Sequence, residues 1–210
     1  MTTIIGIQGD GFSVICSDSR VSSTTDNLSQ IGTLREGSSK VAQNGKYLLG
    51  AAGDVRAINI LHHVFQPPSP PTKCNKKALD QFFTMKFIPA LRECFDLQGY
   101  SVPENREDKD HIAEQGSSVI VSVNNTIYVV ESDYSWSSEA TGLYALGSGS
   151  SYALGALSVL IRNKKVNSQL AKTYAFRSMA IAAKYDPNTG SPYHSFVQGE
   201  KVSVKRRKKV

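Results

Sequence analysis

The chain has 210 residues, which is enough for one domain with a sizeable core and short for two. Hydrophobic residues make up 40% of it and charged residues 20%, which excludes a disordered or fibrous protein. Most of the net charge of +6 lies in the basic run at 205–209, so we expect one domain over 1–204, a disordered basic tail over 205–210, and no nucleic-acid partner.

Alternating apolar residues predict four strands before the first helix. Residues 2–18 form one hairpin around the turn signal Gly9-Asp10-Gly11, and residues 40–53 form a second around Asn44-Gly45. The stretch 22–38 between them is polar and rich in Ser and Thr, and we expect it to be a connection.

Helical spacing begins at Asp54, which suits an N-cap. The predicted apolar face of this helix consists of Val55, Ile58, Leu61 and Val64. A proline-rich surface loop, 66–75, precedes a second helical stretch over 76–97, in which Pro89 is expected to introduce a kink. The charged stretch 103–115 has no apolar period and is expected to be an exposed loop.

The second half returns to strands and then to helices. Residues 117–132 predict two strands across Asn124-Asn125, and 137–147 a third. Two helices follow, over 150–163 and 168–185, and a last hairpin is expected to turn at Gly199-Glu200. On the second of these helices, helical spacing predicts that one face is formed by Leu170, Thr173, Tyr174, Arg177 and Ile181. Grouped strands and helices indicate an α+β fold with antiparallel sheets.

Several kinds of site and location are not expected. No leader-like pattern opens the sequence, and no apolar run approaches the roughly 20 residues of a membrane span, so we expect a cytoplasmic protein. Three separated cysteines, Cys16, Cys74 and Cys94, are expected to be free thiols. His62 and His63 are adjacent and cannot face one metal from a regular helix, while His111 and His194 have no companions at ligand spacing. We therefore predict neither a metal site nor a histidine triad.

The start of the chain offers a nucleophile beside a base. A free terminal amine has a pKa of about 7.7 to 8.0 and can act as a general base. Thr2 follows Met1, and its side chain is of the small kind that methionine aminopeptidase leaves exposed, so a terminal threonine is a plausible mature state. The β-branch of Thr2 restricts χ1 and helps to orient the hydroxyl.

Five separated segments resemble proteasome β-type subunits and the bacterial proteasome-like peptidase that works with an unfoldase ATPase. TTIIGIQGDGFSVICSDSRV resembles the opening hairpin, SKV the start of the third strand, and LLGAAGD the loop that supplies an oxyanion-hole amide. YALGSGSSYALGAL and AAKYDPNTGSP resemble a strand-to-helix turn and a late loop. The site residues that match the family motifs are Thr2, Asp18, Lys40, Gly53, Ser148, Asp186 and Thr189.

This resemblance implies the N-terminal nucleophile hydrolase fold, a four-layer αββα sandwich of two antiparallel sheets. It also implies a nucleophilic Thr2, an adjacent Lys40 oriented by Asp18, and an oxyanion amide from Gly53. Ser148, Asp186 and Thr189 would support the terminal amine. Val21, Ala51 and Ala52 would line the specificity pocket, which predicts an apolar residue before the cut. No metal or organic cofactor is needed.

The family also implies peptide or unfolded-protein substrates, assembly into rings and an ATP-driven unfoldase as partner. Two alternatives stay open. A non-catalytic ring subunit would retain Met1, although a scaffold has no chemical use for Thr2, Asp18 and Lys40 together. A small-molecule amidase would be favoured by a monomeric state and an open site.

Overall fold

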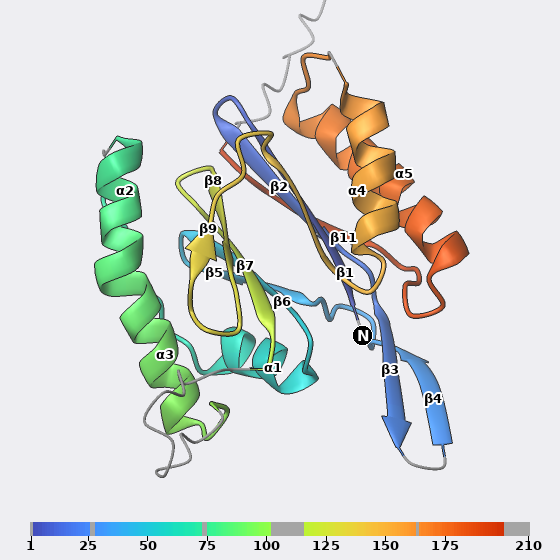
Figure 1. Ribbon diagram of the computed structural model, residues 1–210, viewed down its shortest axis with the longest axis horizontal. Helices are drawn as coiled ribbons and strands as arrows, with labels where there is room; N and C mark the ends of the chain where they lie inside the picture. The colour runs from blue at the N-terminus through green and yellow to red at the C-terminus, as the bar shows by residue number, and fades with distance from the viewer. Residues whose placement is uncertain (1, 26–27, 73–74, 102–115, 163, 200–210) are drawn as a thin grey trace, which may run out of the picture.

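The computed structural model in Figure 1 describes residues 2–25, 28–72, 75–101, 116–162 and 164–199. Two antiparallel sheets form its centre. The four-stranded sheet has the order β10-β1-β2-β11, with β1 Thr3–Gly9, β2 Phe12–Ser17, β10 Leu143–Gly147 and β11 His194–Gln198. The five-stranded sheet has the order β5-β6-β7-β8-β9, with β5 Val41–Asn44, β6 Tyr47–Ala52, β7 Ser118–Val123, β8 Thr126–Val130 and β9 Trp136–Ser137.

The inner faces of the two sheets pack on each other, with β1 against β6 and β8. Ile4 and Ile15 of the first sheet meet Ile120 and Ile127 of the second in one fully buried cluster. Gly6 leaves room for this packing, since a Cβ at that position would lie 2.8 Å from the Ile120 side chain. The period of two along each strand therefore turns alternate residues toward the other sheet and toward the outer helices.

Helices cover both outer faces (Figure 1). On the four-stranded sheet lie α4, Ser150–Ile161, and α5, Ser168–Tyr185. The five-stranded sheet is covered by α1, Val55–His63, and by the continuous helix α2–η1–α3, Lys76–Phe82, Phe83–Phe87 and Ile88–Leu97. The predicted four-layer αββα sandwich is confirmed.

The long helix carries a π-helical turn, η1, just before Pro89. A proline inside a helix has no N–H to donate and crowds the carbonyl four residues earlier, and a wider turn relieves both problems. Phe83 and Phe87 of η1 are fully buried, and the Phe83 ring stacks on Tyr128 with centroids 4.1 Å apart. A π-helical turn thus lies beside Pro89, where a kink was predicted, and it holds two aromatic rings against the sheet.

Some predictions of elements were wrong. The stretch expected to be a connection contains two paired strands, β3 Arg20–Thr25 and β4 Leu28–Thr33, which project from the sandwich as a separate ribbon (Figure 1). The single strand expected over 137–147 is two strands, β9 and β10, and they belong to different sheets.

The predicted helix faces were also partly wrong. Val55 and Val64 are 40% and 42% exposed, while α1 buries Ala57 and Ile60. On α5, Ile181 is 41% exposed, and the buried stripe is instead made of small residues such as Ala171, Ala175 and Ala182. Small side chains let the helix approach the sheet closely. On this helix, small size therefore decided which residues are buried more than hydrophobicity did.

Other predictions fall partly outside the described residues. They are the charged loop 103–115 with His111, the tail 205–210, Cys74, and the last hairpin beyond Gly199. Cys16 and Cys94 are free thiols, as predicted. None of the described helices has the length and apolar character that crossing a membrane requires.

Candidate active site

Thr2 lies at the entrance to β1 and is only 3% exposed. Its backbone carbonyl accepts a hydrogen bond from the Ser148 N–H at 3.0 Å. Gly147, with φ +90°, approaches this carbonyl so closely that a side chain at that position would collide with it. The turn between β10 and α4 therefore fixes the Thr2 backbone.

Asp18 follows directly on β2 and is completely buried. Its carboxylate accepts hydrogen bonds from the backbone N–H groups of Thr3, Arg20 and Gly190 at 3.0, 3.0 and 3.1 Å. The Lys40 ammonium lies 2.6 Å from Oδ1 of the same carboxylate. Four donors from four segments thus meet at one buried carboxylate.

Lys40 stands at the start of β5 and is 2% exposed. Its Nζ donates to the Arg20 carbonyl at 2.5 Å as well as to Asp18. Burial lowers the pKa of Lys40, and the charges of Asp18 and Asp186 partly offset that effect. Thr2 and Lys40 line the same cavity, so the predicted lysine does lie near the predicted nucleophile.

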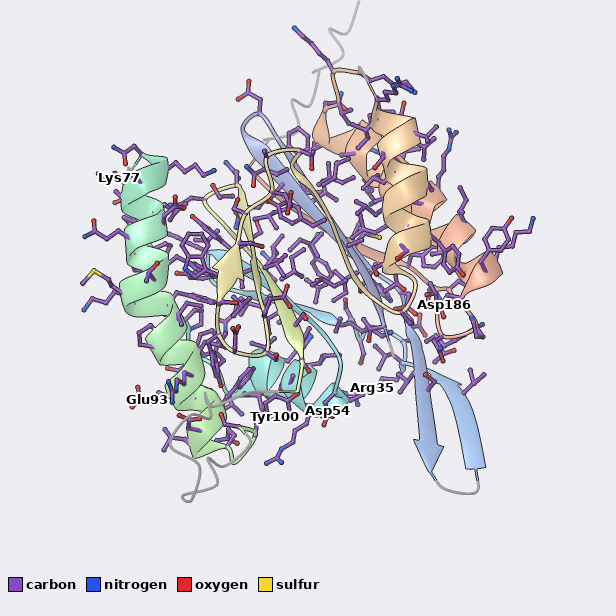
Figure 2. The ribbon with its side chains drawn as sticks, in the orientation of Figure 1. Arg35, Asp54, Lys77, Glu93, Tyr100 and Asp186 are labelled. Carbon is purple, nitrogen blue, oxygen red and sulfur yellow. The ribbon has the colours of Figure 1, made fainter. Side chains whose placement is uncertain are left out.

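Asp186 is the C-cap of α5 and forms the centre of a second polar cluster; Figure 2 labels it at the end of that helix. Its Oδ2 accepts hydrogen bonds from Ser148 Oγ at 2.7 Å and Thr189 Oγ1 at 2.5 Å, and its Oδ1 accepts the Asn188 N–H at 3.1 Å. Burial alone would raise the pKa of Asp186, but these hydrogen bonds hold it below its ordinary value. The three predicted residues Ser148, Asp186 and Thr189 are in direct contact.

Thr3 joins the two polar clusters, although no role was predicted for it. Its N–H donates to Asp18, and its hydroxyl lies 2.6 Å from Thr189 Oγ1. The Gly149 N–H donates to the Thr3 hydroxyl at 3.1 Å. The sequence did contain a signal for Thr3. Because side chains alternate along a strand, the hydroxyl of a residue directly after Thr2 lies on the opposite face of the strand from that of Thr2.

A cavity of about 600 Å³ opens beside Thr2. Its wall combines residues from five different parts of the chain, with Ile58 and His62 both on α1: Thr2, Val21, Lys40, Ile58, His62 and Phe196. His62 was dismissed as a metal ligand, but it contributes to this wall, and its Nε2–H donates to the Ser39 carbonyl at 2.9 Å. No sequence signal placed α1 against this cavity.

Gly53 and part of the predicted pocket are not among the residues that line this cavity. Gly53, with φ +139°, is exposed in the turn between β6 and α1, where a Cβ would lie 2.5 Å from Ser117 Oγ. None of the contacts found among the described residues joins Gly53 to Thr2. Ala51 and Ala52 are buried in β6 and are not among the wall residues, whereas Val21 is.

The described residues contain no group of three His, Cys, Asp or Glu side chains that could hold a metal ion. The side chains of the two clusters around Asp18 and Asp186 supply hydroxyls, carboxylates and one ammonium. Such a set can orient a nucleophile and shift its proton equilibria.

Of the comparisons with known proteins, the one with solved structures supports the fold. No family model matches the chain, and no curated protein matches it. Among solved structures, BPH from Thiobacillus denitrificans in complex with epoxomicin is similar over 94% of this chain and 98% of its own, with a TM-score of 0.68 and 20% identity.

Two further solved structures have the same fold. Eukaryotic HslV from Trypanosoma brucei is similar over 94% of this chain and 99% of its own, with a TM-score of 0.60 and 20% identity. A Gly-1 mutant of Anbu from Hyphomicrobium sp. strain MC1 gives a TM-score of 0.63 and 14% identity over 95% of this chain and 83% of its own. The resemblance to proteasome-like proteins is therefore confirmed at the level of the fold.

Proposed function

We propose that the chain is a proteasome-type threonine peptidase in which Thr2, freed by removal of Met1, is the nucleophile. The observation that carries this proposal is the buried Lys40–Asp18 pair, with 2.6 Å between Nζ and Oδ1, beside a cavity that Thr2 itself lines. Burying an ion pair costs roughly several kcal/mol per ion in desolvation, so such a pair contributes little net stability. A chemical role for Lys40 accounts for its place in the wall.

The proposed reaction begins with attack of Thr2 Oγ on the scissile carbonyl carbon. The Thr2 amine takes the hydroxyl proton, directly or through water, and the nearby Lys40 ammonium favours the unprotonated amine. When the tetrahedral intermediate collapses, the C–N bond breaks and the proton passes to the leaving amine. Water then hydrolyses the Thr2 ester and regenerates the hydroxyl.

The oxyanion of the tetrahedral intermediate needs preorganised N–H donors, and loss of one donor typically lowers the rate by about 10²- to 10³-fold. The Gly53 N–H remains our proposed donor, on the resemblance alone. Ser148, Asp186 and Thr189 are proposed to position the terminal amine, since the Ser148 N–H already holds the Thr2 carbonyl.

The resemblance also supports proposals about cellular context. We propose peptide or unfolded-protein substrates, assembly into a ring, an ATP-driven unfoldase as partner, and a cytoplasmic location. No cofactor enters the proposed chemistry. A gel-filtration or native mass measurement separates a ring from the monomer that a small-molecule amidase would favour.

The decisive test is the intact mass of the native protein, alone and after incubation with epoxomicin, the compound present in the BPH complex. We expect a mass that lacks methionine and a single adduct, absent in Thr2→Ala. Thr33→Ala, at the exposed end of β4, is the matched control and should still form the adduct. A retained Met1 with no adduct would overturn the proposal and favour the non-catalytic ring subunit.

A further inference from the structure

The wall of the cavity contains cationic groups that the proposed chemistry does not use. Arg35, His62 and His63 contribute to it together with Lys40. Among the described residues, no Asp or Glu lines this cavity, and Glu36, the neighbour of Arg35, is not part of the wall. The excess of positive over negative groups is confined to the side formed by α1 and the segment between β4 and β5.

Lys40 does not account for the positive character of this wall. Its ammonium lies 2.6 Å from the Asp18 carboxylate, so the two charges largely compensate each other. The cationic groups left to act on a ligand are Arg35 and, when protonated, the two histidines.

Arg35 presents a partly oriented guanidinium. Its Nε–H donates to Ser38 Oγ at 3.2 Å, and Ser38 also lines the cavity. In the part of the chain that the structure describes, the two terminal nitrogens of Arg35 make no hydrogen bond and no ion pair. A planar guanidinium held through one nitrogen can still bind a carboxylate through the others.

His62 can add a second donor only when it is protonated. Its Nε2–H is already donated to the Ser39 carbonyl, so the neutral ring has only an acceptor at Nδ1. Burial lowers the pKa of His62, the hydrogen bond to Ser39 partly offsets this, and the adjacent His63 lowers the pKa further. A bound carboxylate would favour the protonated ring, whose Nδ1–H could donate to it.

We propose that this wall binds a carboxylate, so that the substrates are peptides with an Asp or Glu side chain close to the scissile bond. Val21, Val41 and Ile58 would contact the aliphatic part of that side chain, and Arg35 and His62 its charged end. The inference rests on the proposed peptidase function and replaces the predicted preference for an apolar residue.

A pH dependence follows from the same geometry. The charged and titratable groups around His62 in this wall are His63 on α1, and Arg35 and Lys40 from the segment between β4 and β5. None of these groups can supply a negative charge, so an acidic ligand in the cavity would add to the stabilisation that the Ser39 carbonyl gives the protonated His62. Preference for an acidic peptide over its amide counterpart should therefore rise as the pH falls from 8 to 6, where a Glu side chain remains ionised.

The test compares two peptides that differ only in Glu or Gln at the residue before the cut. We expect kcat/KM to be about tenfold higher for the Glu peptide, the value of one charge-assisted hydrogen bond at a partly exposed site. Arg35→Gln and His62→Gln should each bring this ratio toward one, and His62→Gln should also flatten its pH dependence. Arg177→Gln, the same change at an exposed position of α5, is the control and should keep the native ratio.

The same pair of peptides should bind Thr2→Ala with a similar ratio of Kd values. This measurement needs no turnover, so it separates the inference from the proposed function. An epoxomicin adduct on Thr2 with no Glu preference would overturn the inference and leave the peptidase intact. A Glu preference in binding without any adduct would support the carboxylate wall and overturn the peptidase. A native ratio that persists in both Arg35→Gln and His62→Gln would refute the assigned residues.

Discussion

The buried pair at the site predicts an asymmetry between its two members. In Asp18→Asn, Lys40 keeps its buried ammonium but loses the carboxylate 2.6 Å away, and three backbone N–H donors lose part of their acceptor. Removing one partner of a buried pair costs about 3–5 kcal/mol. For a domain of this size that corresponds to a fall in Tm of about 6–20 °C.

The opposite change should cost less. In Lys40→Met, the Asp18 carboxylate keeps the N–H donors of Thr3, Arg20 and Gly190, so the buried negative charge stays hydrogen-bonded. We expect a fall in Tm of less than half that of Asp18→Asn. Both variants should lose labelling by epoxomicin, so that Lys40→Met separates chemistry from folding.

Thermal unfolding followed by circular dichroism at pH 7 tests this asymmetry, with all proteins at one concentration because assembly raises apparent stability. Asp10→Asn, the same change at an exposed turn residue, is the control and should leave Tm unchanged. If Lys40→Met melted lower than Asp18→Asn, or if neither variant were destabilised, the account of this pair would be refuted.

Two further predictions concern the second polar cluster. The hydrogen-bonded Asp186 has a lowered pKa in the folded protein, so it stabilises above about pH 4 and that contribution is lost as the pH falls through its folded pKa. Ser148→Ala should therefore lower Tm by about 2–4 °C at pH 7 and by less once the pH is below the folded pKa of Asp186, and a pH-independent loss would contradict this. Gly149→Ala, whose Cβ would lie 2.5 Å from Thr3 Oγ1, should cost about 1–3 kcal/mol in chemical denaturation. Gly155→Ala on the same helix meets nothing within 4 Å and should stabilise by about 1 kcal/mol, and equal effects of the two changes would refute the packing argument.

The sandwich could be predicted because both of its sheets carry strong alternation. Strands such as β1 and β7 place β-branched residues on two buried faces, and Asn124 and Asn125 adopt positive φ values of 50° and 63° in the turn that their side chains favour. The ribbon of β3 and β4 was missed because its residues are mainly Ser and Thr, without an apolar face to bury. The two strands pair through their backbones, and backbone pairing leaves no period in the sequence.

The polar clusters could be predicted in part because their residues lie in segments that resemble the proteasome family. Asp18 and Asp186 stand directly after regular elements, where chain direction changes and carboxylates bind free N–H groups. His62 and Arg35 gave no such signal, since a cavity wall assembled from a helix and a loop has no pattern along the chain. Resemblance to known motifs could therefore find the residues proposed to position Thr2, but not the residues proposed to bind the substrate.

The position of Thr2 depends on its neighbour more than on its own side chain. Thr3 is bonded to Asp18 through its N–H and, through Thr189, to the cluster around Asp186. Asp18 in turn binds Lys40. Thr3 therefore connects the start of the chain to both polar clusters. Because each bond is buried and short, a shift of the Thr2 backbone would break contacts in two clusters at once. The proposed nucleophile is thus held in position before any substrate binds.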